Sequence, residues 1–214
     1  MSTARAAYLP AFPDAADAPP DPRTPRVALA FRQVMEALDL DLADPNLADT
    51  PLRVARAYTE LFAGLREGVE PDLRTFPNEE RYSQMVAVTG IPFHSLCAHH
   101  FLPFFGTAHV AYLPGERILG LSKLARVVEF YARRPQVQER MTEQAIDLLD
   151  RRLQPAGVMV VLQARHMCME MRGVAKTGAL TTTSAVRGAF EQDRTRQEFL
   201  ALLNAPGAGG SRRE

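Results

Sequence analysis

The order in which helical and strand patterns follow one another constrains the fold of this chain most. From Met85 to Leu113 the sequence is rich in β-branched and aromatic residues and is broken by glycine and proline, which predicts strands joined by turns. Two helical patterns come next, and further strand patterns begin at Gly157. Because the helices come in pairs between strand pairs, we expect an α+β fold with a largely antiparallel sheet.

Caps, breakers and apolar spacing predict the element boundaries. Thr24-Pro25 and Thr50-Pro51 each predict the start of a helix, and Gly68 is a plausible end for the second one. Further along the chain, the patterns predict a helix capped by Ser122, a longer helix that begins at Pro135, a strand over 157–171, a short strand over 180–184 and a final helix over 194–203.

The composition of the two ends differs from that of the middle. Residues 1–24 are rich in Ala, Pro and Asp, and residues 205–214 include three glycines, so we predict disordered tails there. Residues 25–204 are expected to form one domain, with a helical extension over 25–68 and a core over 85–204.

Charge and apolar content narrow the class of protein. Lys+Arg and Asp+Glu both total 25, so net charge does not predict attraction to nucleic acid or to an anionic membrane. No apolar run approaches the roughly 18 residues that span a bilayer, and there is no secretory signal pattern. Two cysteines do not make a disulfide scaffold, and we expect a reduced, cytoplasmic protein.

Both cysteines lie beside histidines, in Cys97-Ala98-His99-His100 and in His166-Met167-Cys168. A turn would bring Cys97 and His100 to one side, and on a strand His166 and Cys168 would share a face. Thiolate and imidazole suit zinc. A catalytic zinc site keeps one position open, so we favour Cys97, His100 and Cys168 as ligands, with His99 and His166 left for acid–base work.

Ordinary structural roles compete with this interpretation. A single buried cysteine is usually a small core residue, and a single histidine is usually a hydrogen-bonded structural residue. The joint occurrence of both cysteines and three of the five histidines in two short segments favours the metal site.

A second candidate site is the start of the helix after Gly120. Helix N-termini attract phosphate, and Lys123 and Arg126, three residues apart, would add charge on one side. Arg172 could bring another charge to the same substrate. The alternative is an ordinary capped helix with solvated basic residues. Residues 138–140 on their own predict only a solvated helix face.

Taken together, these segments resemble the GTP cyclohydrolase I family. The strings that carry the resemblance are TPLRVARAY, CAHHFLPFFGTAHVAYLP, GLSKLARVVEFYARRPQVQERMT, HMC followed by MRG, and TRQEFL, in order over about residues 27–200. The resemblance implies a T-fold, in which a four-stranded antiparallel sheet packs on two helices. It also implies a ring of subunits, typically a homodecamer of two stacked pentamers with sites at subunit junctions.

The resemblance also implies roles for single residues. Cys97, His100 and Cys168 match the family's zinc ligands, and His99 and His166 match its catalytic histidines. Ser122, Lys123, Arg126 and Arg172 match the region that binds triphosphate and ribose, with Ser122 also a proton carrier, and Gln138 and Glu139 match the guanine-recognition positions. The implied activity is the zinc-dependent conversion of GTP and water to 7,8-dihydroneopterin triphosphate and formate, the first step of tetrahydrofolate synthesis.

The sequence departs from the family pattern at Ala98, where a glutamate usually stands. Any hydrogen bond that this carboxylate supplies to a neighbouring ligand is absent, so rate, pH profile or metal affinity could differ. Two alternatives stay open: a related T-fold zinc enzyme that acts on another pterin or purine, and a nucleotide-binding regulator in which zinc is structural.

Overall fold

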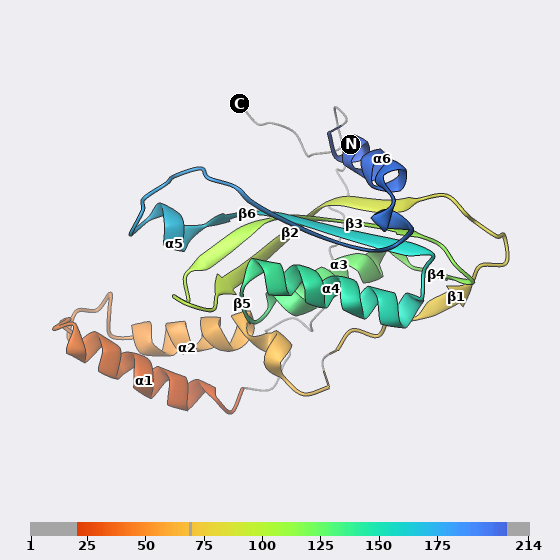
Figure 1. Cartoon of the computed structure of the whole chain (residues 1–214). Coiled ribbons are helices and arrows are strands. Elements are labelled where there is room, and N and C mark those ends of the chain that lie inside the picture. The colour runs from red at the N-terminus through yellow and green to blue at the C-terminus, as the bar shows by residue number, and fades with distance from the viewer. Residues whose placement is uncertain (1–20, 69, 205–214) are drawn as a thin grey trace, which may run out of the picture. The chain divides into compact units, whose positions relative to one another are not determined.

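The computed structural model describes residues 21–68 and 70–204, so the predicted tails lie outside the described residues except for 21–24. The chain divides into two compact units between residues 69 and 70 (Figure 1). Among the helices of the described ranges, none is long and apolar enough to cross a membrane.

The first unit contains two helices that contact each other, α1 (Thr24–Ala37) and α2 (Thr50–Leu61). Both begin at the predicted Thr-Pro pairs, where proline fits the first turn because its missing N–H has no partner there. The second helix does not reach Gly68. It ends at Leu61, because Phe62 leaves the helical backbone conformation (φ −105°, ψ 25°), and a short 3₁₀ turn, η1 (Ala63–Leu65), follows.

The second unit is built on a sheet in the order β5-β2-β3-β6-β7. Its long strands are β2 (Val86–Cys97), β3 (Pro103–Leu113), β6 (Gly157–His166) and β7 (Thr181–Gly188), and each neighbouring pair among them is antiparallel. The predicted antiparallel sheet is therefore confirmed. A two-residue strand, β5 (Pro135–Gln136), adds a parallel edge beside Leu96 and Cys97.

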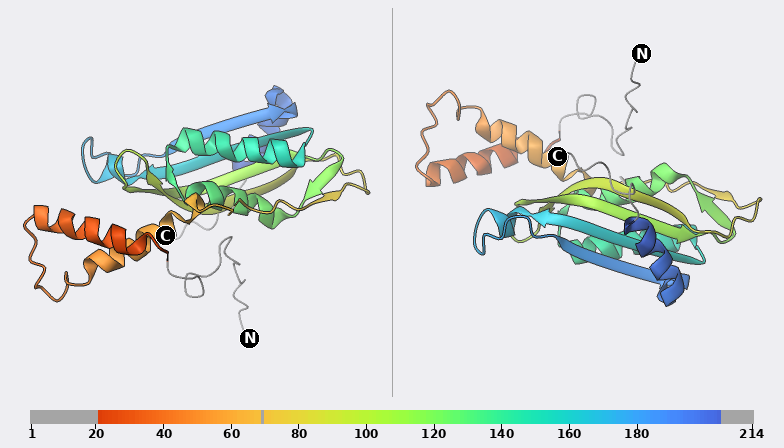
Figure 2. Two further views of the ribbon diagram at one scale, coloured as in Figure 1. Left: turned by 90° about the horizontal axis from the view of Figure 1, so that it is seen from below. Right: turned by 90° about the horizontal axis from the view of Figure 1, so that it is seen from above.

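Helices cover both faces of this sheet. On one face lie α3 (Leu121–Ala132) and α4 (Gln138–Leu153), and on the other lie η2 (Ala189–Glu191) and α6 (Asp193–Asn204), as the views in Figures 1 and 2 show. Strand β6 is buried on both faces over residues 157–162, which is why its sequence is a continuous apolar run. The core under α6 includes these buried residues: Ala111, Met159, Val161, Phe190 and Phe199.

Two short strands, β1 (Thr75–Pro77) and β4 (Arg117–Leu119), form a separate antiparallel pair. The arrangement puts the ends of β2 and β6 and the starts of β3 and β7 at the same end of the main sheet. Turns and short segments at this end carry the residues of chemical interest.

Several predicted boundaries were wrong. The strand expected over 157–171 ends at His166, because the next residues form one helical turn, α5 (Met167–Glu170), in which the Met171 N–H donates to the Met167 carbonyl at 3.0 Å. The helix expected from Pro135 begins at Gln138, since Pro135 pairs with β2. The short strand runs to Gly188 rather than to Ser184, and the final helix lies within one residue of its predicted bounds.

Candidate metal centre

Cys97 is the last residue of β2 and begins a tight turn. Its carbonyl accepts hydrogen bonds from the N–H groups of His100 at 3.3 Å and Phe101 at 2.8 Å, which fold the chain back toward β3. The Ala98 N–H donates to the Gln136 carbonyl at 2.8 Å, so β5 holds the turn from the side. The expectation that a turn brings Cys97 and His100 to one side is confirmed.

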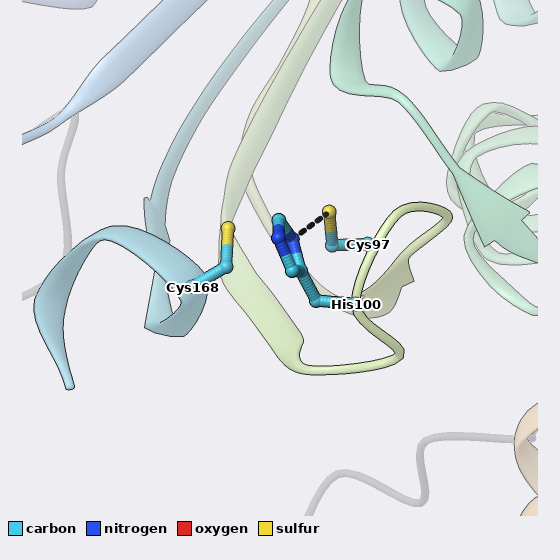
Figure 3. Close-up of side chains that lie close together, drawn as sticks. All are labelled: Cys97, His100 and Cys168. Atoms are coloured by element: carbon cyan, nitrogen blue, oxygen red, sulfur yellow. Dashed lines mark hydrogen bonds between the residues drawn. The ribbon is translucent and has the colours of Figure 1, made fainter. Parts of the chain in front are cut away.

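Cys168 comes to the same place through strand pairing. In the β3–β6 register Phe104 lies opposite His166, so the segment that follows β6 begins beside the turn between β2 and β3. Cys168 lies in α5 and not on a strand, so His166 and Cys168 do not share a strand face. The ligand atoms of Cys97, His100 and Cys168 all lie within 4.8 Å of one another, and the three side chains point toward one another in Figure 3.

This donor set fits a tetrahedral metal of the zinc type. Two ligand atoms on such an ion are about 3.5–3.8 Å apart, and Cys97 Sγ lies 3.8 Å from His100 Nδ1. Burial, together with the neighbouring Cys97 thiol, raises the pKa of Cys168. A divalent cation between the two sulfurs would reverse this effect, because thiolates are stabilised by a bound metal. With three protein donors, a fourth position stays available to water or substrate.

The two other histidines lie beside this cluster. His99 is exposed, and its Nδ1 lies 3.8 Å from Cys97 Sγ. His166 ends β6 and is half-buried, and its ring stacks on Phe104 with centroids 4.7 Å apart and planes 2° apart. Burial lowers the pKa of His166, and the nearby charge of Glu139 opposes that shift. Burial is the larger of the two effects, so the surroundings favour the neutral form of the imidazole.

Gln138 and Glu139 begin α4 but lie in different surroundings. Gln138 is 1% exposed, and its side chain binds His166 and three oxygens of β6 and β7. The solvated face expected for residues 138–140 is therefore wrong at Gln138. Glu139 is exposed and lies within electrostatic reach of His166, where a carboxylate is free to bind a ligand.

The basic residues predicted to bind phosphate fall into two places. Ser122 is exposed, and Lys123 and Arg126 are partly exposed, at the start of α3. The helix cap is Gly120 and not Ser122, which makes no capping hydrogen bond. Within the ranges 21–68 and 70–204, no hydrogen bond or ion pair joins these three residues to the metal cluster. Arg172 follows α5 and is exposed, and its charge reaches Cys168.

Sequence patterns did not indicate two supporting contacts. Phe104 supplies the flat surface on which His166 lies, and it is fully buried against Phe93. Arg165 makes a two-point ion pair with Glu170, at 2.8 and 2.5 Å, which ties α5 to the end of β6 and so fixes the turn that carries Cys168. Both contacts depend on the strand register, which no local pattern encodes.

The sequence of this chain is similar to those of known proteins over most of its length. The chain is 50% identical to the GTP cyclohydrolase 1 of Clostridioides difficile (strain 630), over 83% of this chain and 95% of that relative. It is 51% identical to the GTP cyclohydrolase 1 of Geobacillus kaustophilus (strain HTA426), over 84% and 96%. A solved structure, the archaeosine synthase QueF-Like in the apo form, has a TM-score of 0.40 at 17% identity, over 49% of this chain and 94% of that one.

The family model described as GTP cyclohydrolase I matches residues 27–204, which include most of the first described unit, all of the second and every candidate site residue. With about half of all positions identical to those relatives over most of both chains, the chain belongs to the GTP cyclohydrolase I family and is an enzyme of that family.

Proposed function

We propose that this enzyme holds zinc and converts GTP and water to 7,8-dihydroneopterin triphosphate and formate, as the first step of tetrahydrofolate synthesis. The observation that carries the proposal is the convergence of Cys97, His100 and Cys168 from two separate segments, with His166 beside them. Three donors leave an open position, and a half-buried imidazole next to it suits proton transfer.

The chemistry required is hydrolysis at C8 of the purine. Water adds to C8 and the imidazole ring opens, a second hydrolysis releases C8 as formate, and the ribose then rearranges and closes the new ring with loss of water. A bound zinc ion supplies Lewis-acid chemistry at the open position. We assign His166 and His99 to proton exchange with the purine, and Ser122 is a further proton carrier in this proposal.

The remaining candidate residues bind the substrate away from C8. Lys123 and Arg126 lie in the first two turns of α3, where the helix dipole adds to their charge, and we assign them to the triphosphate. Arg172 is assigned to the same anion. Glu139 is exposed and acidic, so it suits the amino and ring N–H groups of guanine. The resemblance predicts guanine recognition for Gln138 too, but Gln138 is buried and its amide nitrogen already faces oxygens of β6 and β7.

We also propose a T-fold subunit that joins others in a ring, as a homodecamer. Strand β7 is an outer strand, and β5 covers β2 only at Leu96 and Cys97, so both edges of the sheet can pair with another copy. The segment after β6 exposes apolar side chains that a neighbouring subunit would cover: Met169, Met171, Val174 and Leu180. Analytical ultracentrifugation of the full chain tests the assembly, and a monomer at micromolar concentration would refute it.

The direct test of the activity is to incubate zinc-loaded protein with GTP and to measure formate and the fluorescent oxidised pterin. We expect both products in equal amounts. Tight GTP binding with neither product would instead indicate a regulator with a structural metal, a possibility that Ala98 raises because no glutamate stands next to the ligands.

The anion site has its own test. Lys123→Ala is expected to weaken binding of GTP but not of guanosine, because only GTP carries the triphosphate. Arg151→Ala, which removes an exposed positive charge from the last turn of α4, serves as the control. An equal loss of affinity for GTP and guanosine in Lys123→Ala would remove Lys123 from this role.

A further inference from the structure

The side-chain amide of Gln138 is held in one orientation by its surroundings. Its nitrogen lies 3.1 Å from the Leu162 carbonyl, 3.0 Å from the Thr181 carbonyl and 3.2 Å from the Thr183 hydroxyl. Carbonyl oxygens only accept hydrogen bonds, so the group that faces them must be the NH₂. The amide oxygen therefore points the other way, toward His166, and a flipped amide would leave the two carbonyls, of which that of Leu162 is buried, facing an oxygen.

Two threonines reinforce this orientation. The Thr142 hydroxyl donates to the Gln138 backbone carbonyl at 2.9 Å, and Thr142 and Thr183 share a hydrogen bond of 2.7 Å. Since each hydroxyl has one hydrogen, Thr183 must donate to Thr142, and its oxygen is then free to accept from the Gln138 amide. Every donor in this set of hydrogen bonds has an acceptor, so the Gln138 side chain is fixed against strands β6 and β7.

The fixed amide determines the tautomer of His166. Gln138 Oε1 lies 2.8 Å from His166 Nε2, and an amide oxygen cannot donate, so Nε2 must carry the hydrogen. A neutral imidazole with hydrogen on Nε2 has its free lone pair on Nδ1. The ring plane is fixed as well, because it lies parallel to the ring of Phe104.

We propose that Gln138 is a positioning residue that holds His166 as the Nε2–H tautomer and thereby makes Nδ1 the nitrogen available to the substrate. Both amide hydrogens of Gln138 are directed at acceptors within the subunit, so Gln138 influences the reaction through His166. This catalytic part of the inference rests on the proposed function, whereas the tautomer does not.

The tautomer is tested directly by ¹⁵N NMR of the zinc-loaded protein with labelled histidine, because the two ring nitrogens give different signals in the two tautomers. The His166 signals are assigned by their loss in His166→Asn. We expect the Nε2–H form in the unmodified protein. His109 is an internal control, since its Nδ1 accepts from the Gly90 N–H at 3.2 Å and is unrelated to Gln138. An Nδ1–H form of His166 would overturn the proposal, whether or not the enzyme turns over GTP.

A matched pair of variants tests the role in catalysis. Gln138→Met keeps the length of the side chain and removes its bond to His166. The control is Thr59→Val, which removes the hydrogen bond from the Thr59 hydroxyl to the Arg56 carbonyl, outside this network. We expect Gln138→Met to shift the tautomer of His166 and to lower kcat for formate release by at least about tenfold, since positioned proton transfer contributes on the order of 10²–10⁴. Thr59→Val should keep both the tautomer and kcat.

The pattern of kinetic constants separates this role from direct substrate binding. A positioning residue lowers kcat with little change in KM, whereas loss of a direct guanine contact raises KM with kcat kept. The second result would overturn the proposal. Circular dichroism and zinc content confirm that each variant is folded and loaded, and if Gln138→Met does not fold, the tautomer in the unmodified protein still decides. If the unmodified enzyme gives no formate, the proposed function fails while the tautomer measurement stands.

Discussion

Phe104 lies in the core of the sheet and also supports His166 at the candidate site. Its replacement by leucine tests whether the aromatic ring orients His166 in addition to filling the core. The Phe104 ring is fully buried, meets Phe93 edge-on with centroids 6.0 Å apart, and lies parallel to the ring of His166. Leucine keeps an apolar side chain at the position but removes both ring contacts. The substitution therefore leaves His166 with its hydrogen bond to Gln138 and without its flat support.

The size of the effect follows from these two contacts. An aromatic pair contributes about 0.5–1.5 kcal/mol beyond the burial of its area, so the loss of two pairs lowers the free energy of unfolding by about 1–3 kcal/mol. For a chain of this length each kcal/mol corresponds to a fall in Tm of about 2–4 °C. If the stacking energy with His166 is lost from the transition state, kcat falls by about twofold to tenfold.

Phe199→Leu is the matched control. Phe199 is also fully buried and also meets another ring edge-on, that of Phe190 at 6.2 Å, but it belongs to the core under α6. We expect its Tm to fall by an amount of the same order while kcat is unchanged. Thermal denaturation and formate release are measured on both variants, the latter well below both Tm values. An equal fall of kcat in the two variants, or full kcat in Phe104→Leu, would refute the reasoning.

Three further predictions concern the metal, its supporting ion pair and pH. Cys168→Ser should abolish zinc retention, because one of three donors is lost; zinc at one per subunit after dialysis would show that the ligand assignment is wrong. Glu170→Gln weakens the ion pair with Arg165 that fixes the Cys168 turn, so a chelator should remove zinc from this variant roughly tenfold faster. Glu143→Gln, which loses an ion pair with Arg187, is the control and should release zinc at the unmodified rate. Equal release rates in the two variants would contradict the prediction. Burial lowers the pKa of His109, so its contribution to stability is present above the ordinary value of about 6.5 and is lost as pH falls through the lowered pKa. The free energies of unfolding of the wild type and of His109→Gln, measured in urea from about pH 7.5 to 5, should therefore become more similar as pH falls. A difference that stays constant over this range would contradict the prediction.

Elements with a long repeating pattern were predictable from the sequence. The Thr-Pro starts of α1 and α2, the long strands and α6 all come from local signals that act within a few residues. Short elements were not predictable in this way. The four residues of α5 are too few to show a helical period, and β5 exists only because Pro135 and Gln136 lie beside the end of β2. Tertiary contacts therefore decided the boundaries near the site.

The metal cluster itself was predictable because ligand chemistry restricts the choice of residues. The two cysteines are soft donors and the neighbouring histidines borderline ones, and the structure brings the expected three residues together. The surroundings were not predictable. The burial of Gln138 and its bond to His166 depend on how α4 crosses β6 and β7, and the pairing of Phe104 with His166 depends on strand register. The spacing of residues along the chain predicts neither contact.

The way in which the β3–β6 register assembles the cluster has a consequence for folding kinetics. The β2–β3 hairpin closes locally and can form early, but Cys168 reaches the turn at Cys97 only after β6 has paired with β3 across the intervening α3 and α4. Contacts between residues so distant in sequence form slowly, because a large loop must be closed first. High-affinity metal capture is therefore expected among the last events of refolding, and in a stopped-flow experiment the uptake of metal would report completion of the sheet.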